Sequence, residues 1–255
     1  MVFEIDPVPL LFVLFLGVSF AYSSIGLGGA STYSALMVIV GLDHILIPLL
    51  SLTLNLVVST ISGFIFLRRG HARFRLIFPF LVTSVPMAYL GGTLALSKGV
   101  FQLLLLGTLS LVAIRLYWPK QVSRMLSLNR EQQWGVSLLL GSVLGFVAGS
   151  VGIGGGIYLV PLILVLGLGT EKQAAASGAF FVWVNSLSGL LARLPTGLSI
   201  VIDWFPLLLA VLGGGFLGAH LGATKWSPRT MQKVLGLIVL VAIVLLAYKV
   251  MSASG

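Results

Sequence analysis

The chain is a succession of apolar stretches separated by short polar connections. Ten stretches can be traced, at residues 8–24, 29–42, 45–67, 76–97 and 100–117, and then at 134–149, 154–168, 173–192, 204–224 and 229–250. A helix rises 1.5 Å per residue, so about 20 residues are needed to cross the hydrocarbon core of a bilayer. The third, fourth, ninth and tenth stretches reach that length, and the pattern predicts an all-α polytopic membrane protein.

The composition agrees with this assignment. Hydrophobic residues make up 58% of the chain and charged residues 8%, against about 25% charged in a typical soluble domain. The net charge of +9 lies in short connections, so we expect no nucleic-acid partner. The chain has no cysteine, which excludes thiol catalysis and disulfides. Its acidic start is unlike that of a signal peptide, so we expect the first stretch to be a retained membrane segment.

Two glycine-rich breaks interrupt the apolar sequence, SSIGLGGA at residues 23–30 and GSVGIGGG at residues 149–156. Glycine costs about 1 kcal/mol relative to alanine inside a helix, so these runs should end one. A broken helix in lipid is tolerated where its backbone is shielded by protein or lines a polar cavity. Matching breaks in two halves are typical of transporter binding sites. Each flanking pair of stretches forms either two short tilted spans or a re-entrant hairpin.

The breaks belong to a longer internal repeat. Gly26 and Gly152 are 126 residues apart, and glycine, serine and proline matches continue at an offset of 126 or 127. The pattern predicts a first membrane repeat at 1–117, a cytoplasmic linker at 118–133 and a second repeat at 134–255. Each repeat has five segments, so the second should enter the membrane from the opposite side, giving two homologous inverted-topology halves with glycine-broken short helices.

The charges support that inversion. If the connection at residues 68–75 is cytoplasmic, twelve of the fifteen basic residues are cytoplasmic, as the positive-inside rule expects. Both chain ends then face outward. The twelve are Arg68, Arg69, Arg73, Arg75, Arg115, Lys120, Arg124, Arg130, Lys172, Lys225, Arg229 and Lys233.

A helix that restarts after glycines offers free N–H groups and the positive end of its dipole, which suits an anion. The glycines also let a ligand approach the backbone closely. We therefore expect an anion site at the two breaks, and the alternative is that the glycines only allow tight helix crossings. The candidate residues here are Ser24, Gly28, Gly29, Ser150, Gly154, Gly155 and Gly156.

Neutral polar side chains inside the segments are further candidates. Hydroxyl and amide groups can bind an anion's oxygens at less cost than a buried base, and the alternative is hydrogen bonding between helices. These candidates are Asn55, Ser59, Ser177, Asn185 and Ser188. Arg193 either binds or guides an anion or extends to the headgroups. His220 either couples protons to transport or packs as a neutral side chain. No catalytic constellation, metal site or cofactor motif is found, and we expect no enzymatic activity.

The glycine motif GIGGG before Pro161, the run AAASGAFFVWVNSLSGLLARL at 174–194, the Asp203-Trp204 pair and GAHLGA at 218–223 resemble the sulfite exporter TauE/SafE family over residues 10–250. The resemblance implies a secondary transporter, an exporter, of small sulfur-containing or organic anions such as sulfite or alkylsulfonates, working without ATP. Its partners would be the anion, the lipid of an inner or plasma membrane and a second copy in a homo-oligomer. The alternatives are a passive anion channel and a non-transporting membrane scaffold subunit.

Overall fold

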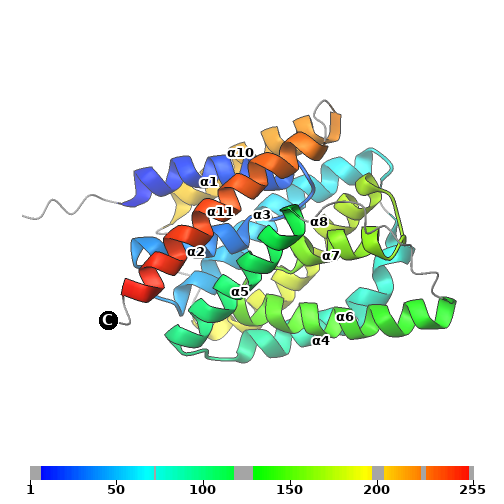
Figure 1. Cartoon of the computed structure of the whole chain (residues 1–255), viewed down its shortest axis with the longest axis horizontal. Helices are drawn as coiled ribbons and strands as arrows, with labels where there is room; N and C mark the ends of the chain where they lie inside the picture. Colours follow the sequence, from blue (N-terminus) through cyan, green and yellow to red (C-terminus); the bar gives the residue numbers. More distant parts are fainter. Residues whose placement is uncertain (1–6, 72, 118–128, 197–203, 225–227, 253–255) are drawn as a thin grey trace, which may run out of the picture.

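A computed structural model describes residues 7–71, 73–117, 129–196, 204–224 and 228–252. Within these residues the protein is all-α, with ten α-helices and one short 3₁₀ turn, η1 (Leu194–Thr196). The chain runs back and forth between two ends of the molecule, with α1 beginning and α11 ending at the left of Figure 1. The helices are α1 (Pro7–Ser23), α2 (Ala30–Val40), α3 (Leu46–Arg68), α4 (Phe74–Thr93), α5 (Lys98–Tyr117), α6 (Arg130–Val151), α7 (Gly156–Val165), α8 (Glu171–Ala192), α10 (Phe205–Thr224) and α11 (Pro228–Ser252).

Each predicted apolar stretch overlaps one of these helices, so the predicted all-α polytopic fold is confirmed. Two helices of the second half begin earlier than hydrophobicity indicates. A capping box formed by Asn129 and Gln132 starts α6, and one formed by Thr170 and Gln173 starts α8. Residues 130–133 of the predicted linker thus form the first turn of α6, and residues 118–128 lie outside the described residues.

Six helices in the described part of the chain are long and apolar enough to cross a membrane: α3, α4, α6, α8, α10 and α11. Hydrophobicity alone indicated four of them, α3, α4, α10 and α11, and the structure adds α6 and α8, which their polar first turns lengthen. In contrast, α2 has 11 residues and α7 has 10, or about 16 Å at 1.5 Å per residue. Each is about half the length of a span. Figure 1 shows α2 leading back toward the end where α1 begins, and α7 toward the end where α6 begins, as expected of re-entrant hairpins.

Glycines spaced four residues apart hold two helix pairs together. Three glycines of α6 lie against main-chain carbonyls of α4, and three glycines of α10 lie in the same way against α1. These glycines are Gly141, Gly145 and Gly149 on α6, and Gly214, Gly218 and Gly222 on α10. Added side chains would collide with the neighbouring backbone, so both pairs are close-packed small-residue contacts. The first helix of each predicted repeat thus packs on the fourth helix of the other.

The long helices α3 and α8 pack against each other and connect the two predicted repeats. α3 also contacts α2 and α10, whereas α8 also contacts α7 and α4. Buried polar side chains gather on these two helices, including Asn55 on α3 and Asn185 on α8, both fully buried. The interface between α3 and α8 therefore provides polar groups at the centre of an otherwise apolar bundle.

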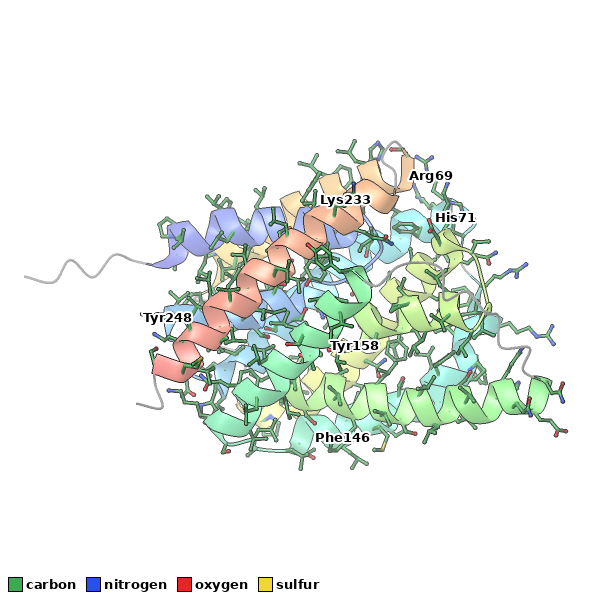
Figure 2. All side chains as sticks on the ribbon, in the orientation of Figure 1. Arg69, His71, Phe146, Tyr158, Lys233 and Tyr248 are labelled. Atoms are coloured by element: carbon green, nitrogen blue, oxygen red, sulfur yellow. The ribbon has the colours of Figure 1, made fainter. Side chains whose placement is uncertain are left out.

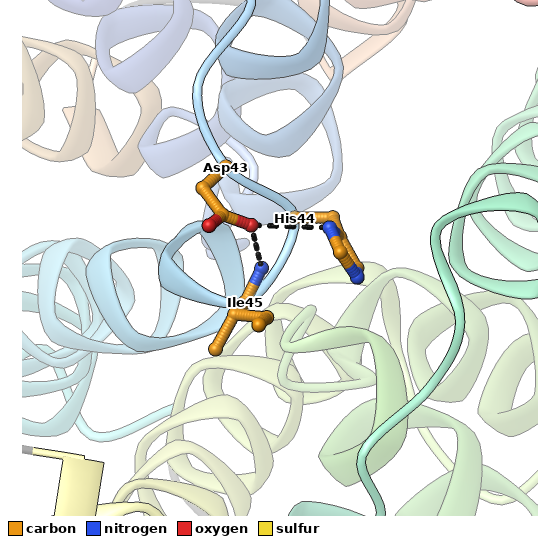
Figure 3. A network of polar contacts seen from close by, with 3 residues as sticks. All are labelled: Asp43, His44 and Ile45. Atoms are coloured by element: carbon orange, nitrogen blue, oxygen red, sulfur yellow. Dashed lines mark hydrogen bonds and ion pairs between the residues drawn. The ribbon is translucent and has the colours of Figure 1, made fainter.

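The two ends of α3 differ in charge. Before α3, an Asp43 carboxylate oxygen lies 3.1 Å from His44 Nδ1 and accepts a hydrogen bond from the Ile45 N–H at 3.0 Å (Figure 3). After α3, the connection to α4 is basic, and Figure 2 shows Arg69 and His71 at the end opposite Tyr248 of α11. An acidic group before a helix and basic groups after it also complement the helix dipole.

Candidate functional site

The two glycine breaks have the same backbone geometry where each long helix ends. α1 ends at Ser23, and the Leu27 N–H then donates to the Tyr22 carbonyl at 2.9 Å. α6 ends at Val151, and the Ile153 N–H donates to the Ala148 carbonyl at 3.0 Å. Both bonds run from a residue to the fifth residue before it, as in a Schellman motif, and they recur at the predicted offset of 126 residues.

Left-handed glycines recur at the same offset. Gly26 and Gly152 have φ of 74° and 79°, and Gly41 and Gly167, which follow the two half-length helices, have φ of 92° and 64°. A residue with a side chain is unfavourable in this conformation. The left-handed backbone therefore explains why glycine occurs at both positions of each pair. The internal repeat inferred from the sequence thus recurs in the conformation of the chain.

The two breaks differ at the start of the half-length helix. Gly154 and Gly155 are both left-handed, with φ of 70° and 73°, and Gly155 is the N-cap of α7. Gly29, the N-cap of α2, has φ of −89°. Neither N-cap makes a side-chain capping hydrogen bond of its own. The first N–H groups of α2 and α7 must therefore find partners from elsewhere in the protein or from a ligand.

Asn55 of α3 connects the two breaks. Its Oδ1 accepts a hydrogen bond from the Ala30 N–H, the first residue of α2, at 3.1 Å. Its Nδ2 donates to the Ile153 carbonyl in the second break at 3.2 Å. A side chain added at Gly28 or at Gly154 would collide with the Asn55 amide. The breaks therefore meet at one buried place, and Asn55 caps one helix start while holding the other break beside it.

Three buried polar atoms of α8 have no hydrogen-bond partner in the described part of the chain. They are the hydroxyls of Ser177 and Ser186 and Oδ1 of Asn185. The Ser186 hydroxyl lies next to Gly154, because a Cβ built there would be 2.8 Å from it. A buried polar group without a partner lowers the free energy of unfolding by about 1–3 kcal/mol, so such a group in a native protein calls for an explanation such as a bound ligand or water. Ser186 was not among the sequence candidates, since only the fold places it at the glycines.

Four other predicted serines have hydrogen-bond partners. Ser24, Ser59 and Ser150 donate to carbonyls three or four residues earlier in the chain, at 2.7 Å, 2.6 Å and 2.7 Å. Ser188 donates to the Val85 carbonyl of α4 at 2.7 Å. Back-bonded hydroxyls of this kind are common in membrane helices and here hold helices or helix pairs together.

Arg193 turns into the protein at the end of α8. Its side chain is 7% exposed, and it donates from Nη2 to the Ser150 carbonyl at 3.1 Å and from Nη1 to the Gly189 carbonyl at 3.3 Å. Both carbonyls belong to the last turns of helices, which lack intrahelical partners and carry partial negative charge. Arg193 therefore neutralises the ends of α6 and α8, which neither sequence alternative for this residue anticipated.

His220 lies on the outside of the bundle. It is exposed on α10 and stacks on Phe216, with ring centroids 6.3 Å apart. The opposite face of α10, which carries Gly214 and Gly218, packs on α1. The structure thus brings Gly28, Asn55 and Gly154 together with the unanticipated Ser186, and it leaves His220 on the surface.

Comparisons with known proteins agree with this architecture. The chain is 31% identical to the probable membrane transporter protein y4hK of Sinorhizobium fredii over 236 residues, which cover 91% of this chain and 95% of that protein. It is 25% identical to the probable membrane transporter protein YjnA of Bacillus subtilis, over 85% of this chain and 91% of that protein. No solved structure matches the chain.

The profile of the family described as "Sulfite exporter TauE/SafE" matches residues 10–250, which is nearly the whole chain and includes both glycine breaks. Helices of membrane-spanning length fill the same range. The chain is therefore a multi-pass membrane transporter that belongs to the sulfite exporter TauE/SafE family.

Proposed function

We propose that this transporter exports small sulfur-containing or organic anions, such as sulfite or alkylsulfonates, across the inner (plasma) membrane. One observation carries the proposal: the two glycine breaks, which lead into the N-termini of α2 and α7, meet at Asn55 in the buried centre of the bundle. Each N-terminus has a dipole equivalent to about half an elementary charge. Together they provide positive potential for an anion at a place where the side chains of Asn55 and Ser186 carry no charge.

The Asn55 amide supports this placement of the anion. Its Oδ1 already accepts from the Ala30 N–H, so an oxygen atom at that position is stable. An oxygen of the anion takes the same kind of bond at α7, where Ser186 supplies a hydroxyl. Asn185 Nδ2 and Ser177 lie on the same helix and complete the proposed site. The other sequence candidates, apart from the surface residue His220, contribute through their backbone, as Gly29, Gly155 and Gly156 do, or hold together the helices that carry the site.

A neutral site also suits release. A fixed buried charge would cost several kcal/mol to keep in the membrane and would hold the anion tightly, whereas dipoles and hydroxyls attract it less strongly. In alternating access, the pairs α1–α10 and α4–α6 would move as close-packed units, and the α3–α8 contact would slide between them. The site would then open to one side of the membrane at a time.

Transport by the purified protein in vesicles tests the proposal. We expect saturable exchange of labelled sulfite or methanesulfonate across the vesicle membrane. Flux that rises linearly with concentration would identify a passive channel instead, and no flux above that of empty vesicles would favour a scaffold subunit. Anion binding should also raise thermal stability, by about 2.7 kcal/mol at a hundredfold excess over Kd.

Two substitutions separate the site from the fold. Asn185→Leu should weaken binding by about 1–3 kcal/mol through the lost hydrogen bond, which is about 5- to 150-fold in Kd. Gly154→Val should abolish transport, and its left-handed φ of 70° means that valine will lower stability as well. Gly213→Val is the matched control, because a Cβ there meets no atom within 4 Å. Wild-type transport by both site variants would place the site elsewhere.

A further inference from the structure

A valine of α8, Val182, stands beside the glycines of both breaks. A Cβ built on Gly28 or on Gly154 would be 3.0 Å from its Cγ1 methyl, and one built on Gly156 would collide with its Cγ2 methyl. Val182 is 1% exposed. Its two methyl groups therefore fill the space that these three glycines leave open, on the apolar side of the place where the breaks meet.

Asn55 is the other side chain that lies against glycines of both breaks. It provides a polar wall, with both ends of its amide in hydrogen bonds. Val182 provides an apolar wall, and Ser186, one helical turn further along α8, lies against Gly154 with its hydroxyl unpartnered in the described part of the chain. The meeting place of the breaks is thus polar on one side and apolar on the other.

We infer that Val182 sets the size of the substituent that the transported anion can carry. This inference rests on the proposed function, because it assumes that an anion binds between the two breaks. The oxyanion group faces the helix N-termini and Asn55, so its substituent points toward the valine methyls. A sulfite ion or a methanesulfonate fits against them, and a longer alkyl chain has to displace them.

The inference predicts a change in selectivity when the valine is shortened. In Val182→Ala, affinity for propanesulfonate should rise relative to methanesulfonate by about fourfold for each methylene that gains an apolar contact. Affinity for methanesulfonate itself should change little. Val239→Ala is the matched control, because Val239 is a fully buried valine of α11 that none of the break glycines contacts. It removes the same two methyl groups from the core, so it should lower stability without altering the ratio.

The experiment uses thermal shift to measure Kd for methanesulfonate, ethanesulfonate and propanesulfonate. The wild type, Val182→Ala and Val239→Ala are compared side by side. If the wild type binds methanesulfonate and Val182→Ala keeps the wild-type ratio, the inference is wrong and the proposed function stands. If the wild type binds none of the three alkylsulfonates and no sulfite either, the proposed function fails, and the inference fails with it.

A second measurement covers the case in which Val182→Ala does not fold. The chain has no cysteine, so Val182→Cys introduces a single thiol of nearly the same size. Methanesulfonate should slow its reaction with N-ethylmaleimide at least tenfold, and it should not protect Val239→Cys. A thiol at position 182 that reacts equally fast with and without a saturating anion would overturn the inference.

Discussion

The two fully buried asparagines should respond in opposite ways to the same substitution. Replacing Asn55 by leucine removes the acceptor of the Ala30 N–H and the donor to the Ile153 carbonyl, both in the buried centre. Each backbone group left without a partner costs about 1–3 kcal/mol. The free energy of unfolding of Asn55→Leu should therefore fall by about 2–6 kcal/mol.

Asn185 has a different environment. Its Nδ2 donates to the Phe181 carbonyl, which lies four residues earlier in the same helix and so also accepts the regular helical bond. Its Oδ1 has no partner in the described part of the chain. Asn185→Leu removes a buried unpaired oxygen and leaves no backbone group alone, so the stability of the anion-free protein should stay the same or rise.

Thermal unfolding of the two variants in detergent, followed by circular dichroism, tests this contrast. A loss of 1 kcal/mol shifts the melting temperature of a protein of this size by about 2–4 °C, so Asn55→Leu should melt at least about 4 °C below the wild type. Asn185→Leu should melt at or above the wild-type temperature and bind the anion more weakly than the wild type does. If Asn55→Leu is as stable as the wild type, the hydrogen bonds of Asn55 do not hold the two breaks together. If Asn185→Leu melts as low as Asn55→Leu, the predicted contrast between the two asparagines is wrong.

Three further outcomes follow from the packing, the topology and the charges. Gly218→Ala should lower the melting temperature because its methyl group would collide with the backbone of α1. Gly213→Ala should not lower it, since a methyl group at that position meets no other atom, and equal effects would contradict the close packing of α10 on α1 through its glycines. In sealed vesicles or cells, an impermeant maleimide should label His71→Cys only from the cytoplasmic side and Ile45→Cys only from outside, and the reverse pattern would overturn the topology. Burial lowers the pKa of the His71 imidazole, and the positive charges of Lys172 and Arg69 lower it further. The folded protein should therefore bind a proton at His71 less readily than the unfolded chain does, and the free energy of unfolding should fall as the pH drops through about 6.5. NMR titration of His71 should show a lowered pKa that rises in Lys172→Gln. If the pKa of His71 is the same in Lys172→Gln as in the wild type, the lysine is not a cause of the shift.

The sequence alone determined the helices, the breaks and the repeat. Whether a segment partitions into lipid depends on its own residues, so ten apolar stretches are enough to predict ten helices. A glycine run ends a helix for a local reason, and so SSIGLGGA and GSVGIGGG end α1 and α6 where expected. The offset of 126 residues reappears as matched left-handed glycines, because the same local sequence gives the same backbone. Inversion of the second repeat in the membrane stays a prediction.

Only the tertiary structure decided which polar groups share a site. In a water-soluble helix, the polar face indicates the side that faces water, but a membrane helix is apolar toward both lipid and protein, so its rotation cannot be deduced from the pattern. Asn55 and Ser59 share a face of α3, yet Asn55 joins the two breaks while the Ser59 hydroxyl bonds to its own helix. Nothing in the sequence distinguishes Val182 and Ser186 from other valines and serines of the chain. They lie at the glycines of the breaks because α8 packs against α3. Local sequence therefore fixes the helices and their ends, whereas the contents of the site depend on helix rotation and crossing, which packing over the whole bundle sets.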